Sequence, residues 1–139
     1  MMNSLAFILI FPLLGALILF LCPKNFKLLS TLHVLISAVT SAGLLCNVGK
    51  LLSGNAEAFY AYDKFLFLDS LGCVFLVLIA VTGFLVNLYS TTYMKWEIQG
   101  GHLDLSDLRK YYALCHVFVF TMTLSVICNN VAFMWAAVE

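Results

Sequence analysis

Charge is what this sequence has least of. Only 10% of its 139 residues are Asp, Glu, Lys or Arg, 63% are hydrophobic, and the formal net charge is zero. A soluble globular domain carries about 25% charged residues. The composition therefore excludes an ordinary soluble protein and indicates a membrane protein. The sequence also contains no cluster of basic residues and no basic arm, so it gives no support for nucleic-acid binding.

Motifs for redox, metal and nucleophilic chemistry are absent as well. The five cysteines are far apart, with no CxxC and no Cys/His cluster of metal-ligand spacing: Cys22, Cys46, Cys73, Cys115 and Cys128. We expect them to be small apolar core residues in helices. No Gly-rich phosphate loop occurs, and His102 near Asp104 is a lone pairing of a kind common in surface loops. We therefore expect no cofactor, no metal and no catalytic centre on this chain.

Long runs without charged residues fill most of the chain, each close to the ~20 residues that cross a bilayer as a helix. We predict spanning helices over about residues 3–22, 28–50, 69–93 and 111–130, and the start of a fifth over 131–139. No Lys or Arg precedes the first run, and its length is enough to span, so it is not typical of a cleavable signal. The predicted fold is an all-α integral membrane helical bundle in one domain, with four spanning helices plus the start of a fifth.

The connections between these runs differ in character. Residues 51–68 mix charges with aromatic side chains, which favours a segment at the level of the lipid headgroups. Asp69 is well placed to cap the third helix, although a functional role is the alternative. Residues 94–110 carry mixed charge around Gly100-Gly101 and are predicted to form a solvated connection.

The distribution of basic residues predicts the orientation, because short loops rich in Lys and Arg stay in the cytoplasm. One side of the predicted membrane receives Lys24, Lys27, Lys95, Arg109 and Lys110, and the other receives Lys50 and Lys64. We therefore expect the N-terminus outside and the 1–2 and 3–4 connections inside.

Glu139 is the one carboxylate that the last apolar run carries. It lies nine residues beyond Asn130, which corresponds to ~13 Å along a helix, close to the bilayer midplane. A carboxylate at that depth is costly and by default indicates an ion or proton pathway. The alternative is a chain-terminal side chain that seeks water at the membrane surface.

Two histidines are further candidates for a proton pathway. His33 and His116 each lie about six residues inside the presumed cytoplasmic ends of the second and fourth helices. Histidine relays protons near neutral pH, but a hydrogen-bonded structural imidazole is the alternative. Other polar residues lie in or beside the runs: Asn87, Thr121, Thr123, Asn129 and Asn130. We consider two roles for them, namely to hold water or bridge helices, or to form turns and packing contacts.

Three segments carry a family resemblance. They are the run Tyr111-Tyr112-Ala113-Leu114-Cys115-His116-Val117-Phe118-Val119-Phe120-Thr121-Met122, the pair Asn129-Asn130, and the end Met134-Trp135-Ala136-Ala137-Val138-Glu139. They resemble the antiporter-like membrane subunits of respiratory complex I and its relatives, and most closely the F-type subunit of hydrogenase-4-like, group 4 membrane-bound hydrogenases. Asp69-Ser70-Leu71-Gly72 and the Tyr89 to Tyr93 segment are similar to that family as well.

The resemblance implies a function and partners. Glu139 matches the acidic residue of the fifth helix, which in that family acts in proton translocation together with lysines of later helices. Other membrane subunits and peripheral redox subunits would supply hydrogenase, quinone or formate chemistry, in the inner membrane of a bacterium or archaeon. Because this chain contains no later helices, we expect it to be an N-terminal fragment of such a subunit. The alternative is a complete small membrane assembly or scaffold protein without transport activity, and whether the ion is H⁺ or Na⁺ stays open.

Overall fold

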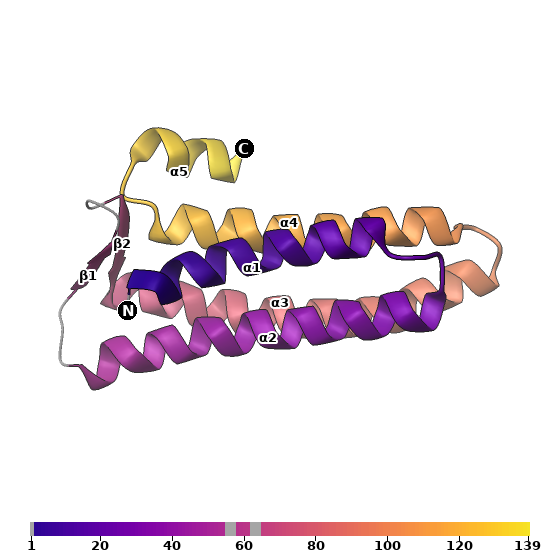
Figure 1. Ribbon diagram of the computed structural model, residues 1–139, viewed down its shortest axis with the longest axis horizontal. Coiled ribbons are helices and arrows are strands. Elements are labelled where there is room, and N and C mark those ends of the chain that lie inside the picture. Colours follow the sequence, from indigo (N-terminus) through magenta and orange to yellow (C-terminus); the bar gives the residue numbers. More distant parts are fainter. Residues whose placement is uncertain (1, 55–57, 62–64) are drawn as a thin grey trace.

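Four helices run alternately up and down in the computed structural model, which describes residues 2–54, 58–61 and 65–139 (Figure 1). They are α1 Met2–Leu21, α2 Phe26–Ser53, α3 Ser70–Gln99 and α4 Leu105–Ile127. α1 and α3 each pack between α2 and α4, so every helix has two main neighbours. A short helix, α5 Val131–Val138, runs back along the outside of α4. The all-α membrane bundle predicted from the apolar runs is confirmed.

The expected number of spanning helices is slightly too high. Among the described residues, three helices are long and apolar enough to cross a membrane, namely α2, α3 and α4. For α1, the apolar stretch within these residues is Ala6–Leu21. The chain is nevertheless a multi-pass membrane protein.

The helix boundaries differ most at the predicted solvated connection over residues 94–110. α3 continues to Gln99 and α4 begins at Leu105, so only a tight turn remains, with Gly101 in a left-handed conformation (φ +73). Charged residues in these extensions interact locally, as Lys110 Nζ does with Asp107 Oδ1 at 3.2 Å. Mixed charge here marks helix ends that project beyond the apolar runs, because a helix needs no hydrophobic surface once it reaches water.

A small β-hairpin, which the sequence analysis did not predict, follows α2. β1 Ala58–Ala61 pairs antiparallel with β2 Leu66–Asp69. Leu66 also forms an isolated bridge with Cys128, where the extended backbone ends α4. Part of the segment expected at the headgroup level, including Lys64, lies outside the described residues. The described part of this segment therefore forms a β-hairpin at one end of the bundle and is not an irregular loop.

Side-chain caps define where three helices begin. The Asp69 carboxylate accepts a hydrogen bond from the Gly72 backbone N–H at 2.7 Å, which confirms the predicted cap of α3. Asn25 caps α2 and Asn130 caps α5 in the same way. Each such cap is worth about 1 kcal/mol.

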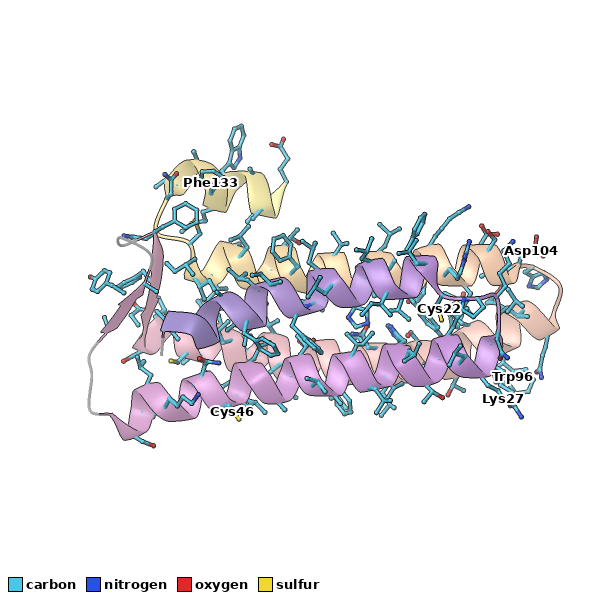
Figure 2. All side chains as sticks on the ribbon, viewed as in Figure 1. Cys22, Lys27, Cys46, Trp96, Asp104 and Phe133 are labelled. Carbon is cyan, nitrogen blue, oxygen red and sulfur yellow. The ribbon has the colours of Figure 1, made fainter. Side chains whose placement is uncertain are left out.

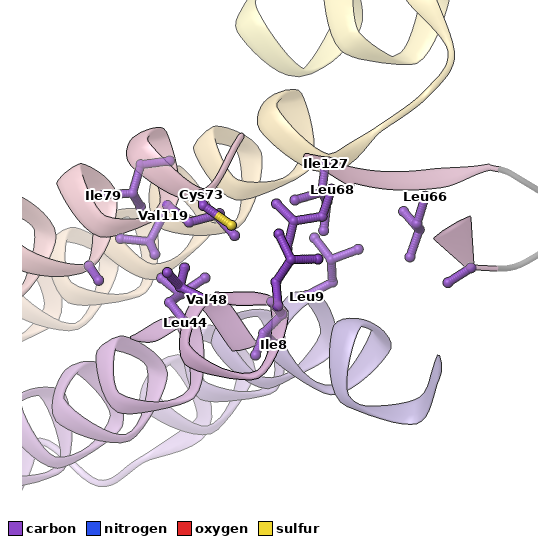
Figure 3. Packing of buried hydrophobic residues seen from close by; sticks show 14 residues of the cluster. Ile8, Leu9, Leu44, Val48, Leu66, Leu68, Cys73, Ile79, Val119 and Ile127 are labelled. Atoms are coloured by element: carbon purple, nitrogen blue, oxygen red, sulfur yellow. The ribbon is translucent and has the colours of Figure 1, made fainter. Parts of the chain in front are cut away.

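Two apolar clusters form the core. Near the hairpin lies a cluster that includes Leu44, Leu76 and Ile127, all fully buried (Figure 3). Near the opposite end lies a second cluster that includes Leu19, Leu29, Leu108 and Tyr112. Where the two clusters meet, α2, α3 and α4 carry buried polar residues, among them His33, Asn87 and His116. This polar layer holds the candidate site.

The cysteines only partly meet their expected role as core residues. Cys22, Cys73 and Cys128 are buried and Cys115 is half-buried. Cys46 is exposed on the outer side of α2 (Figure 2), so the prediction was wrong for this residue. A membrane helix has a lipid-facing side on which small apolar residues are equally at home.

Candidate functional site: a buried histidine pair

A layer of polar side chains crosses the interior of the bundle between the two apolar clusters. On α2 the residues recur three or four apart, which places them on one face of the helix. The buried polar residues of this layer are His33, Ser37 and Thr40 from α2, Asn87 and Ser90 from α3, and His116 from α4, whereas the buried Thr123 lies between Val119 and Ile127 of the first cluster. Polar groups buried in a membrane bundle are costly unless they are hydrogen-bonded. Their partners therefore decide what the layer can do.

His33 and His116 are direct partners. His33 Nδ1 lies 3.1 Å from His116 Nε2, and both side chains have no exposed surface. The second ring nitrogen of His33, Nε2, lies 3.3 Å from Ser90 Oγ. We refer to His33 and His116 as the histidine pair. The sequence analysis singled out each residue separately, and the structure brings them together.

The position of His116 differs from the expectation. His33 lies about two turns inside α2, but α4 begins at Leu105, so His116 lies near the middle of its helix and not six residues from the end. The contact forms because the first turns of α4 extend past the start of α2. A proton role for the histidine pair stays a prediction.

Tyr112 holds the histidine pair from one side. Its ring stacks on His33, with ring centroids 4.0 Å apart and planes at 9°. Its hydroxyl lies 3.1 Å from Ser30 Oγ, one turn before His33 on α2. This support was not predicted from the sequence. The signal that could have found it is the spacing of Tyr112 and His116, which lie four residues apart and therefore on one face of α4.

A narrow crevice lies next to His116. It is lined by Ser37, Thr40, Ser41, Ile79, Gly83, Asn87, His116 and Val119, and it has no room for a water molecule in this conformation. Asn87 Nδ2 donates to Ser37 Oγ at 3.0 Å across it. Among the described side chains, His116 Nδ1 is buried and has no hydrogen-bond partner. Buried polar atoms rarely lack a partner, so this nitrogen needs an explanation.

Glu139 lies away from the histidine pair. It follows α5, is exposed, and borders a groove with Leu114, Val117, Phe118 and Thr121 near the middle of α4. These residues lie on the face of α4 opposite to His116, since they are separated from it by roughly half a helical turn. The structure therefore does not join Glu139 to the histidines. Its depth in a bilayer stays a prediction.

The other polar candidates have structural roles that the geometry explains. The Asn130 side chain accepts hydrogen bonds from the backbone N–H groups of Ala132 and Phe133. The backbone N–H of Asn129 donates to the Phe65 carbonyl at 2.8 Å. Together with the Asp69 cap, these bonds shape the chain reversal between α4 and α5 beside the hairpin. A part in ion movement stays a prediction for all three residues.

The described residues contain no group of three or more His, Cys, Asp or Glu side chains that could hold a metal ion. The histidine pair supplies only two nitrogen atoms at its contact, and these already face each other. Two imidazoles in this arrangement can pass a proton between them.

Two comparisons with known proteins found a match. The family profile described as NADH-Ubiquinone oxidoreductase (complex I), chain 5 N-terminus matches residues 63–100. The chain is 30% identical to a protein named Hydrogenase-4 component F homolog from Methylacidiphilum infernorum (isolate V4), over 98% of this chain. The match covers 27% of that relative, so the chain spans about a quarter of its length. No solved structure matches.

Proposed function

Because both matches support an antiporter-like membrane subunit of the complex I and group 4 hydrogenase family, we propose that this chain is part of a proton-translocating subunit. The parent assembly would be a hydrogenase-4-like or NADH-quinone oxidoreductase-like complex. The observation that carries this proposal is the similarity to the hydrogenase-4 relative over nearly the whole chain.

In this function, partner subunits carry out the redox chemistry and this chain contributes to the ion path in the membrane. Glu139 is the group that would take up and release a proton. A carboxyl group in apolar surroundings is driven to its neutral form, and a cation that moves close to it favours the ionised form. Alternation between these two situations is a workable pumping step. The partner cation would come from a longer parent protein or from a neighbouring subunit.

The rival function is that of a small membrane assembly or scaffold protein without transport activity. One observation favours it: the described helices already bury two apolar clusters among themselves, so they form a bundle without further helices. The DNA directly downstream of codon 139 distinguishes the two functions. We expect a continuing or frameshifted reading frame that encodes more apolar helices. A stop codon followed by unrelated sequence would favour the scaffold protein.

We also propose that the chain lies in the bacterial or archaeal inner membrane with its N-terminus outside. Basic residues gather at the turns α1–α2 and α3–α4, where Figure 2 shows Lys27 and Asp104 at the same end of the bundle. Cytoplasmic short loops carry such an excess of Lys and Arg. Reporter fusions after Lys27 and Lys110 should therefore read as cytoplasmic and a fusion after Gly54 as external. A reversed pattern would overturn the orientation.

A further inference from the structure

The hydrogen bonds around the histidine pair fix which nitrogen carries each proton. The Ser90 hydroxyl donates to the Asn87 carbonyl at 2.8 Å, which uses its single proton. Ser90 Oγ must then accept from His33 Nε2–H, at 3.3 Å. In a neutral ring the other nitrogen of His33, Nδ1, is an acceptor, so it accepts from His116 Nε2–H. His116 Nδ1 is left with a free lone pair, in agreement with its lack of a partner.

From this order we propose that the histidine pair is a one-proton relay in which His116 Nδ1 takes up the proton and the Ser90 side of His33 releases it. The inference rests on the proposed function, because it requires that the parent subunit moves protons. It assigns a transfer step to the interior of the four-helix bundle, on the face of α4 opposite to Glu139.

The transfer balances without any redox partner. A proton binds to the lone pair of His116 Nδ1, and the N–H bond at His116 Nε2 breaks as that proton moves to His33 Nδ1. The N–H bond at His33 Nε2 then breaks and its proton passes to Ser90 Oγ, while the Ser90 hydroxyl proton leaves its bond to the Asn87 carbonyl for a water molecule that a local opening of the bundle admits. Both rings end neutral, each with its proton on Nδ1 in place of Nε2. A half-turn of each ring about its Cβ–Cγ bond resets the pair without returning the proton, and for His33 this turn requires Tyr112 to release the ring between transfers.

Two features suit the histidine pair to this task. Only one excess proton fits on it, because two adjacent cations at 3.1 Å would repel strongly. On the release side, the half-buried Tyr111, which lies toward the basic end of α4, interacts with Ser90. On the uptake side, His116 borders the crevice that Ser37, Thr40 and Asn87 line. Because this crevice has no room for a water molecule, uptake requires a local opening of the crevice.

Tyr112 is a positioning residue in this relay. Its stacking on His33 and its hydroxyl contact with Ser30 oppose rotation of the His33 ring. The rings of the histidine pair are held at 69° to each other, with the bonded nitrogens facing. Proton transfer along a hydrogen bond depends on such prior alignment.

The test uses the complete subunit assembled in its complex, in membrane vesicles. His116→Gln keeps a hydrogen-bonding side chain but cannot carry a proton, so we expect proton translocation to fall at least tenfold while redox turnover and assembly persist. His33→Gln should give the same loss, and the double variant should be no worse than either single variant, because both residues serve one step. The matched control is His102→Gln, on an exposed histidine in the α3–α4 turn, which should leave translocation unchanged.

Nitrogen-15 NMR of ring-labelled histidine in the same subunit reports the tautomers directly. We expect both members of the histidine pair to be neutral with the proton on Nε2, and the His116 signal to change in His33→Gln. A proton on Nδ1 of His116 would overturn the proposed order. Wild-type translocation in His116→Gln, with Glu139→Gln inactive, would overturn the relay and leave the proposed function intact. A wild-type complex that moves no protons would overturn both.

Discussion

Replacement of Glu139 by Gln in the complete subunit is expected to abolish proton translocation while the subunit still inserts and assembles. The substitution preserves size and hydrogen-bonding capacity but removes the group that titrates. Glu139→Asp should retain part of the activity, because the carboxylate survives on a shorter side chain. Glu139 is exposed and forms no ion pair with any residue that the structure describes, so little stability should be lost with its charge.

Measurement of protons moved per redox turnover in membrane vesicles checks this prediction. Asp107→Asn provides the matched control, since it also replaces a carboxylate by its amide but at an exposed helix end beside Lys110. The control should keep wild-type stoichiometry. If Glu139→Gln kept it too, Glu139 would be removed from the mechanism and would be a structural acid.

A single methyl group at position 15 is expected to destabilise the bundle. Gly15 of α1 lies against Ile36 of α2, and a Cβ at this position would overlap Ile36 Cγ2. Ile36 is buried in the second apolar cluster, so it has little room to move aside. Gly15→Ala should therefore cost about 1–3 kcal/mol, the usual cost of overpacking a core. The contact depends on glycine because α1 and α2 approach closely there, as small residues allow in membranes.

Gly49→Ala is the matched control for this change. It places the same methyl group on α2, where no atom lies within 4 Å, so it should be neutral or stabilise the helix by up to about 1 kcal/mol. The apparent melting temperature of the two variants in detergent checks both expectations. Ile36→Ala in the Gly15→Ala background should recover part of the loss by opening space. Equal melting temperatures for Gly15→Ala and Gly49→Ala would show that α1 shifts without cost.

The helices were predictable because uncharged runs of this length have few other structures available in a bilayer. Their ends were not, since Glu97 and Asp107 look like loop residues in the sequence and lie on helices that reach water. The β-hairpin was missed for another reason. Its strands have four residues each, and the alternation of buried Leu66 and Leu68 is too short to stand out beside long apolar runs.

The candidate site was only partly predictable. His33 and His116 could be recognised as polar residues at comparable depth, but their contact depends on how α2 and α4 are rotated about their axes. Apolar residues cover every face of these helices, so hydrophobicity does not indicate which face is inward. The polar residues Ser37, Asn87 and Ser90 carry that information. They indicate the protein-facing side because lipid cannot satisfy their hydrogen bonds.

The joint between the hairpin and the α4–α5 turn has an evolutionary consequence. Phe65 and Asn129 are joined there through backbone atoms, and Leu66 and Cys128 form the adjoining bridge. Backbone groups are the same for almost every amino acid, so the side chains of this turn can drift without loss of the joint. Proline at position 129 is the exception, because it has no N–H to donate. The direction in which α5 leaves the bundle, and with it the placement of Glu139, can therefore outlast extensive sequence change around it.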